Sequence, residues 1–96
     1  MKVTFHDDAL AEYVDGVAWY ERDYPGRGER FAAAVEKAIE AIAGQPDTFP
    51  TRLGVRAATV HRFPYVVFFT RSGEETVRVL AVAHAKRRPK YWRGRR

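Results

Sequence analysis

The stretch WYERDYPGRGERFAAAVEKAIEAIAG, residues 19–44, decides the fold because it joins the end of one helix to the whole of a second. The Pro-Gly pair at residues 25–26 ends the first helix, since proline cannot continue a helix and glycine accommodates the turn. From Phe31 onward the apolar residues recur at helical spacing, and the alanines between them let another element approach closely. Gly44 and the nearby Pro46 end the second helix. Two helices joined by so short a turn predict an antiparallel hairpin.

The residues before this hairpin predict a short strand and the start of the first helix. Residues 2–6 alternate polar and apolar side chains, as a strand does. Asp7 and Asp8 then supply an N-cap, and their charge suits the helix dipole. The predicted apolar stripe of this helix follows the i, i+3, i+4, i+7 spacing. Its members are Leu10, Tyr13, Val14, Val17, Tyr20 and Tyr24.

Beyond the hairpin the period of the apolar residues changes from that of a helix to that of a strand. Residues 45–54 form a predicted loop, and residues 55–63 a predicted strand of mixed polarity. Residues 65–71 and 76–84 are apolar on both faces, as expected of covered central strands, and residues 72–75 make the hairpin turn between them. The predicted fold is therefore α+β, with the order βααβββ. The helical hairpin packs on a small, mainly antiparallel sheet, and a short basic helix or tail follows.

The composition predicts one domain, residues 1–96, with no cofactor. The chain is 46% hydrophobic and 14% aromatic, which is too apolar for disorder. It has no cysteine, which fits a reducing cytoplasm. No apolar run approaches the length of a membrane span, so no membrane association is expected. The three histidines are far apart in the sequence and have no cysteine nearby, so no metal site is predicted.

The formal charge of +5 belongs to the end of the chain. The last eleven residues, KRRPKYWRGRR from Lys86 to Arg96, hold seven Lys or Arg and no acid; we call them the basic segment. Residues 1–85 hold all twelve acids and sum to about −2. Such an asymmetry favours a polyanion or an acidic protein as partner, with a merely solubilising end as the alternative. The candidate contacts are Lys86, Arg87, Arg88, Lys90, Arg93, Arg95 and Arg96, of which residues 93–96 could also be a frayed end.

Several aromatic residues and one histidine are further candidates for function. Tyr91 and Trp92 either stack on bases or form the apolar side of a short helix docked on the sheet, with Pro89 in its first turn. His84 ends the last strand, where an imidazole could act on an RNA hydroxyl or simply cap the sheet. Trp19 lies off the apolar stripe of the first helix, which suggests either a protein contact or packing under a loop.

These pieces together resemble the ParE/RelE superfamily, the toxins of bacterial type II toxin–antitoxin systems, often called plasmid stabilisation proteins. The resemblance rests on the hairpin WYERDYPGRGERFAAAVEKAIEAIAGQPDTFP, on HRFPYVVFFT and on VLAVAHAKRRPKYW, and it extends from Val3 to Trp92. It implies a small α+β toxin neutralised by a cognate antitoxin, whose C-terminal segment typically wraps the helical hairpin and the sheet. An acidic antitoxin segment would suit the basic segment, and operator DNA would be reached only through the antitoxin.

The superfamily divides by target. RelE-like members cut mRNA on the ribosome with a cluster of Arg and Lys, often with a Tyr near the C-terminus. One key Arg of that cluster follows an aromatic residue on the third strand, and here Val66 occupies that position. A valine can neither bind phosphate nor stabilise a transition state. ParE-like members instead inhibit DNA gyrase by binding and need no catalytic set.

Three hypotheses follow from this resemblance. The favoured one is a ParE-like toxin that binds gyrase and is no enzyme, which would slow growth by blocking DNA synthesis. The second is a ribosome-dependent endoribonuclease with Arg62, His84, Lys86 and Tyr91 as its candidate catalytic residues, Trp92 being an alternative to the tyrosine. The third is a toxin fold that is no longer toxic and only binds an antitoxin.

Overall fold

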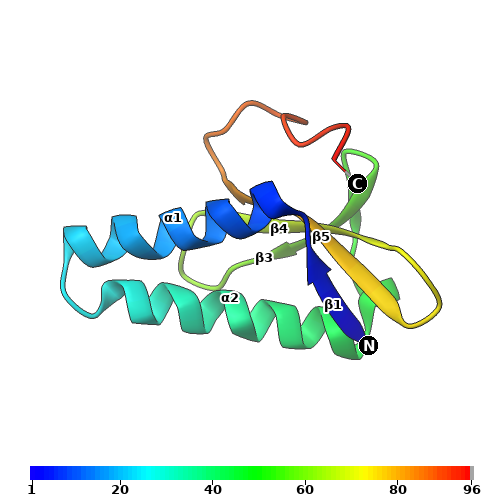
Figure 1. The fold of residues 1–96 in the computed structure, drawn as a ribbon, viewed down its shortest axis with the longest axis horizontal. Helices are drawn as coiled ribbons and strands as arrows, with labels where there is room; N and C mark the ends of the chain where they lie inside the picture. The colour runs from blue at the N-terminus through cyan, green and yellow to red at the C-terminus, as the bar shows by residue number, and fades with distance from the viewer. Residues whose placement is uncertain (96) are drawn as a thin grey trace.

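The computed structural model describes residues 1–95, and over these residues the chain folds into two helices and a five-stranded sheet (Figure 1). In chain order the elements are β1 (Lys2–Phe5), α1 (Asp7–Asp23), α2 (Arg27–Gly44), the short 3-10 helix η1 (Pro46–Thr48), β2 (Thr51–Arg52), β3 (Val55–Thr59), β4 (Tyr65–Arg71) and β5 (Thr76–His84). The predicted α+β class and the predicted helical hairpin are confirmed.

The sheet has the strand order β1-β5-β4-β3-β2, which places the first and last strands of the chain side by side (Figure 1). β1 runs parallel to β5, with Phe5 opposite Val79, and the other neighbours are antiparallel. The two helices form the connection out of β1, and they cover one face of the sheet (Figure 1). The other face is left to the residues that follow β5.

The main core lies between the helices and the sheet. Its fully buried side chains include Phe31, Val35 and Ile42 of α2 and Val67 and Phe69 of β4. Tyr20 of α1 packs on Phe31 with ring centroids 5.0 Å apart. A Cβ at Gly16 would lie 2.7 Å from Cε2 of Phe31, closer than atoms in contact allow. Glycine at this position therefore lets α1 approach the aromatic core.

The buried face of α1 differs from the predicted stripe. Ala9, Gly16 and Tyr20 are buried, whereas Leu10 and Val14 are 47% and 57% exposed. The small residues allow α1 to lie close against α2 and β5, so Ala9 and Gly16 pack inward beside Tyr20. Tyr24, the last residue of the predicted stripe, is exposed as well. An apolar strip is thus left facing outward on α1.

The remaining differences from the predicted elements have local causes. β3 ends at Thr59 because residues 60–64 form a turn in which Arg62 has a φ of 70°. The two-residue strand β2 lies in the predicted loop. The side chain of His6, and not of Asp7 or Asp8, caps α1 by accepting a hydrogen bond from the backbone of Asp8. Among residues 1–95, no helix is long and apolar enough to cross a membrane.

Candidate partner-binding site

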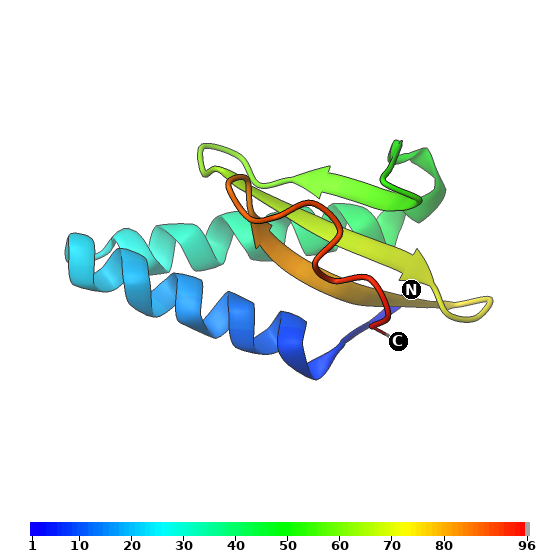
Figure 2. The same cartoon turned by 90° about the horizontal axis from the view of Figure 1, so that it is seen from above.

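The basic segment crosses the face of the sheet opposite the helices (Figures 1 and 2). Trp92 is only 5% exposed and packs on Phe68 of β4, with ring centroids 5.0 Å apart. The two rings and three alanines of the sheet form a second, smaller core: Ala57, Phe68, Ala81, Ala83 and Trp92. The predicted docking of Trp92 is therefore confirmed, and its indole is held inside the fold.

The expectation of a short helix in this segment is wrong. Residues 85–94 form a series of turns. Lys90 and Gly94 have φ values of 63° and 92°, in the left-handed region that interrupts a right-handed helix. Pro89 therefore lies in a turn and starts no helix. The alternative of a basic tail without a helix is the one observed.

Arg95 fastens the end of the basic segment to α1. Its Nη1 and Nη2 donate to the two carboxylate oxygens of Glu12 at 3.1 and 3.2 Å. The side chains of Arg95 and Glu12 are 15% and 14% exposed, so the ion pair is largely withdrawn from water. Burial lowers the pKa of Arg95, but the hydrogen bonds and charge of Glu12 outweigh it and leave that pKa raised. A frayed end is thus wrong for Arg95, and Arg96 lies outside the described residues.

The same ion pair completes the hydrogen bonding of β5. β1 ends opposite Val79, so among residues 1–95 the rest of β5 has no strand on that side. Val82 N donates to Glu12 Oε1 at 3.0 Å, and Arg95 Nη1 donates to the carbonyl of Leu80 at 2.9 Å. Leu80 is an extra residue in the pairing of β5 with β4. Glu12 and Arg95 therefore cap an open strand edge as well as ordering the basic segment.

Tyr91 lies between two arginines, and its hydroxyl is buried. The guanidinium carbons of Arg87 and Arg95 lie 4.0 and 5.1 Å from the centroid of the Tyr91 ring. Its hydroxyl is buried and makes no well-aligned hydrogen bond among residues 1–95. Burial, and then the nearby carboxylate of Glu12, raise the pKa of Tyr91 above its usual range. The ring borders a pocket at the sheet but the hydroxyl is buried, a placement that does not favour acid–base chemistry by Tyr91.

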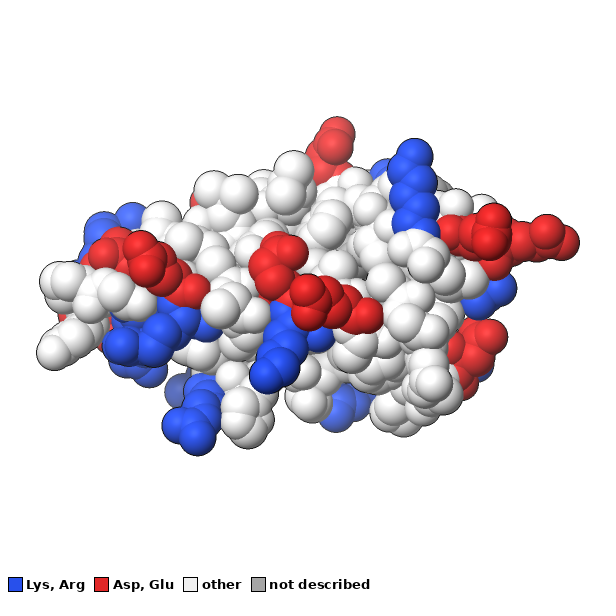
Figure 3. All heavy atoms as spheres, turned by 90° about the horizontal axis from the view of Figure 1, so that it is seen from below, with Lys and Arg blue, Asp and Glu red and all other residues white. Residues whose placement is uncertain are grey.

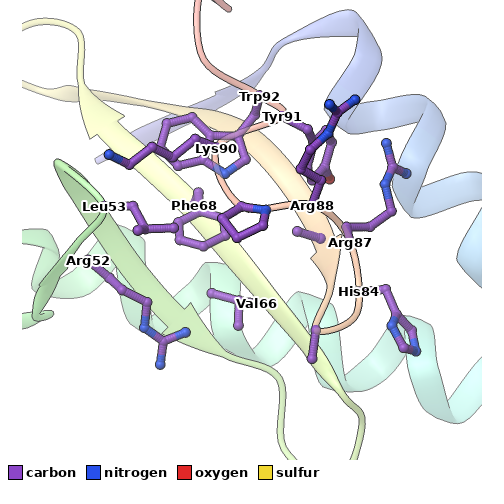
Figure 4. A pocket seen from close by; sticks show the side chains of 13 residues that line it. Arg52, Leu53, Val66, Phe68, His84, Arg87, Arg88, Lys90, Tyr91 and Trp92 are labelled. Atoms are coloured by element: carbon purple, nitrogen blue, oxygen red, sulfur yellow. The ribbon is translucent and has the colours of Figure 1, made fainter.

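A pocket of about 180 Å³ opens between the basic segment, β4 and the turn after β2; we call it the sheet pocket. Its apolar side includes Val66, Phe68 and Trp92 (Figure 4). Its lining also contains four Lys or Arg and no acid, the cationic residues being Arg52, Arg87, Arg88 and Lys90. Val66 thus lies in a cation-lined pocket, where the resemblance places an arginine in RNA-cutting relatives.

His84 and Lys86 form a turn at the end of β5. Nδ1 of His84 accepts a hydrogen bond from the backbone N of Lys86 at 3.0 Å, and its ring lies edge-on to Tyr65. Since Nδ1 is an acceptor, a neutral ring carries its proton on Nε2. The imidazole points away from Phe68 and Trp92 (Figure 4). This geometry agrees with the alternative in which His84 caps the end of the sheet.

Arg62 does not join the other catalytic candidates. It lies in the turn between β3 and β4, where its Nε contacts Nε2 of His61 at 3.2 Å. Neither Arg62 nor Lys86 lines the sheet pocket. Tyr91 lines it but has a buried hydroxyl, and His84 is turned toward Tyr65. The structure therefore does not bring the four candidates together into one acid–base site.

A second hollow, of about 300 Å³, lies between α1 and the end of β5; we call it the α1 hollow. Trp19 borders it and is 61% exposed, with the guanidinium of Arg22 6.0 Å from its ring centroid. His84 and Arg87 line both this hollow and the sheet pocket. The exposed indole, the histidine and the basic segment thus share one side of the molecule.

The charge pattern differs between the two faces. On the face opposite the basic segment, acidic and basic side chains are interspersed (Figure 3). Lys86, Arg87, Arg88, Lys90 and Arg93 are all exposed, and within residues 1–95 none of them forms an ion pair. Among the same residues no group of His, Cys, Asp or Glu could hold a metal. The exposed cations therefore form a surface suited to binding an anionic partner.

Three residues of this region escape prediction from the sequence. Arg52 and Leu53 come from the predicted loop, and only the pairing of β2 with β3 brings them to the sheet pocket. Glu12 is in sequence only a polar position on the same helix as Trp19, and its ion pair with Arg95 spans 83 residues. The one sequence signal that could have indicated the role of Glu12 is an acidic residue on the side of the helix that faces the sheet.

The helical hairpin on one face of this sheet agrees with the small α+β toxin that the resemblance to the ParE/RelE superfamily implies. A family model described as the ParE toxin of the type II toxin–antitoxin system, parDE, matches residues 3–89. This match spans most of the sequence, and the chain belongs to the ParE toxin family.

A solved structure shares the fold. A chain of the "Chromosomal ParDE TA system from P. aeruginosa" superposes with a TM-score of 0.76 and 16% sequence identity. The match covers 90% of this chain and 97% of that one. Among curated proteins, no sequence matches this chain significantly.

Proposed function

We propose that this ParE-family toxin acts by binding DNA gyrase and is neutralised by an acidic antitoxin. The observation that carries the proposal is the chemistry of the sheet pocket. Cations line it, but Val66 stands where the resemblance places the key arginine of RNA-cutting members of the superfamily. The other candidates for acid–base chemistry are dispersed, buried or engaged in capping. Such a site favours binding over phosphodiester cleavage.

The charge distribution supports an acidic antitoxin segment as the natural partner of the basic segment. Within residues 1–95 its exposed cations form no ion pair, so an anionic partner would find them available. A second feature is the apolar strip left outward on α1. A shallow, mostly apolar depression there is lined by Tyr13, Val14, Val17, Ala18 and Glu21. An amphipathic helix of an antitoxin would suit this strip, as helix-in-groove recognition requires.

The test is inhibition of plasmid supercoiling by purified gyrase. The basic segment should not be deleted for this purpose, because Trp92 and Arg95 hold the fold together. Arg88→Glu changes an exposed charge at the sheet pocket, and Arg30→Glu makes the same change on the exposed side of α2. We expect the wild type and Arg30→Glu to inhibit equally, and Arg88→Glu to inhibit at least about tenfold less.

His84→Gln separates binding from cleavage. If the protein acts by binding, this variant keeps the wild-type effect on gyrase, provided that its fold is intact. Loss of toxicity in a folded His84→Gln variant, with cleavage of mRNA on translating ribosomes by the wild type, would establish the ribonuclease alternative. An effect on neither process would point to a toxin fold that has lost its toxicity.

A further inference from the structure

We propose that the sheet pocket binds one apolar side chain from an acidic peptide segment of a protein partner. The carboxylates that flank this side chain would engage Arg52, Arg88 and Lys90. This inference deepens the proposed function and rests on its premise that the chain works by binding an acidic protein surface. The inference is supported by the make-up of the pocket, whose apolar floor is bordered by cations from two separate segments of the chain.

The size of the pocket limits its occupant. At about 180 Å³ it is smaller than the roughly 300–1,000 Å³ typical of sites for whole small molecules. Val66, Phe68 and Ala83 present methyl groups and ring carbon to it, with no hydrogen-bonding side chain among them. An aliphatic or small aromatic side chain fits such a floor, and its burial is favourable by the hydrophobic effect.

The rim of the pocket determines the chemistry on either side of that apolar group. Arg52 comes from β2, and Arg88 and Lys90 come from the basic segment. Within residues 1–95 these three form no ion pair, and no acid lines the pocket. Carboxylates next to the anchoring side chain would therefore meet unpaired cations across the pocket mouth.

A nucleic-acid base is a poorer occupant for the same pocket. Base recognition needs an exposed aromatic face and polar groups directed at the base edges. Trp92 and Phe68 pack on each other with tilted rings and are buried, and Arg87 and Arg95 lie over the ring of Tyr91. The cations alone would attract the phosphate backbone, but they would leave the apolar floor unused.

The experiment is a titration of the isotopically labelled full chain, followed by amide and indole NMR shifts. The probes are the peptides Ac-Glu-Asp-Leu-Asp-Glu-NH₂ and Ac-Glu-Asp-Gly-Asp-Glu-NH₂, with a short oligouridine as the nucleic-acid comparison. We expect the leucine peptide to shift Val66, Phe68, Ala83 and the indole of Trp92 in a saturable way. The glycine peptide should bind at least about tenfold more weakly, because it lacks the apolar anchor.

Two variants keep the inference falsifiable. Val66→Asp places a carboxylate on the pocket floor and should weaken leucine-peptide binding at least about tenfold. Lys90→Ala removes one rim charge and should weaken it less, whereas Arg30→Ala on α2 should change nothing. The free variants are compared with the wild type by their NMR spectra, so that only folded proteins are interpreted.

Two results would overturn the inference. One is equal affinity for the leucine and glycine peptides, which would mean attraction by charge alone. The other is tighter occupation of the pocket by oligouridine than by the leucine peptide. The supercoiling assay separates this inference from the proposed target. If the protein inhibits gyrase but does not bind the leucine peptide, only the proposed role of the sheet pocket is contradicted. If it binds the peptide but does not inhibit gyrase, only the proposal of gyrase as target is contradicted.

Discussion

Replacing Arg95 by alanine is expected to lower the free energy of unfolding by about 2 kcal/mol. Breaking a fully buried ion pair costs about 3–5 kcal/mol, whereas an exposed pair contributes about 0–1 kcal/mol. The Glu12–Arg95 pair lies between these limits, with side chains 14% and 15% exposed. Both side chains keep some contact with solvent, so water can replace Arg95 at Glu12 and at the carbonyl of Leu80 once it is removed.

Urea unfolding followed by tryptophan fluorescence measures this change. For a chain of this length, a loss of about 2 kcal/mol corresponds to a fall in melting temperature of about 8–16 °C. Arg93→Ala is the matched control, since Arg93 is exposed and forms no ion pair within residues 1–95. It should change the free energy of unfolding by less than about 0.5 kcal/mol.

A double-mutant cycle isolates the contribution of the pair itself. Glu12→Ala should cost more than Arg95→Ala, because it removes the largely buried carboxylate partner of Arg95 and also leaves the backbone N–H of Val82 without its acceptor. With both residues changed, the loss should be smaller than the sum of the single losses by about 1–2 kcal/mol. Equal losses in Arg95→Ala and Arg93→Ala, or additive losses in the cycle, would refute the anchoring role.

The remaining predictions concern packing and the exposed indole. Trp92→Ala should destabilise the fold by about 3 kcal/mol, because it removes the centre of the second core; thermal unfolding measures this. Gly16→Ala should lower the free energy of unfolding by about 1–3 kcal/mol, because the new Cβ would collide with Phe31. Gly44→Ala, whose Cβ would meet nothing within 4 Å, should be neutral or slightly stabilising, and urea unfolding of the two variants compares them. Trp19→Ala should leave stability within about 0.5 kcal/mol but weaken gyrase inhibition at least about tenfold, as expected of an exposed aromatic contact, and the supercoiling assay measures the second effect.

Much of the fold could be predicted from periodicity alone. The Pro-Gly pair and the change from helical to strand spacing predicted the hairpin, and the apolar runs predicted β4 and β5 within their observed limits. The inward face of α1 could not be predicted in this way, because Gly16 and Ala9 allow close approach without being strongly apolar. Hydrophobic spacing identifies which residues are apolar, but close packing also depends on which residues are small.

The candidate site could be predicted only in part. The basic segment and the docking of Trp92 follow from charge counting and from the position of an aromatic pair after an apolar strand. The helix expected there does not form, because Lys90 and Gly94 adopt left-handed conformations. The contributions of Arg52 and Glu12 depend on contacts between distant parts of the chain. No local pattern in the sequence specifies such pairings.

The measurement that tests the central claim most directly is pulse-labelling of DNA and protein synthesis in bacteria after tightly controlled induction of this chain. The His84→Gln variant is induced in parallel. If the protein acts by binding gyrase, DNA synthesis falls first, and the variant behaves as the wild type does. If protein synthesis falls first and the folded variant is harmless, the protein is a ribonuclease despite Val66, and gyrase binding as its mode of action is contradicted.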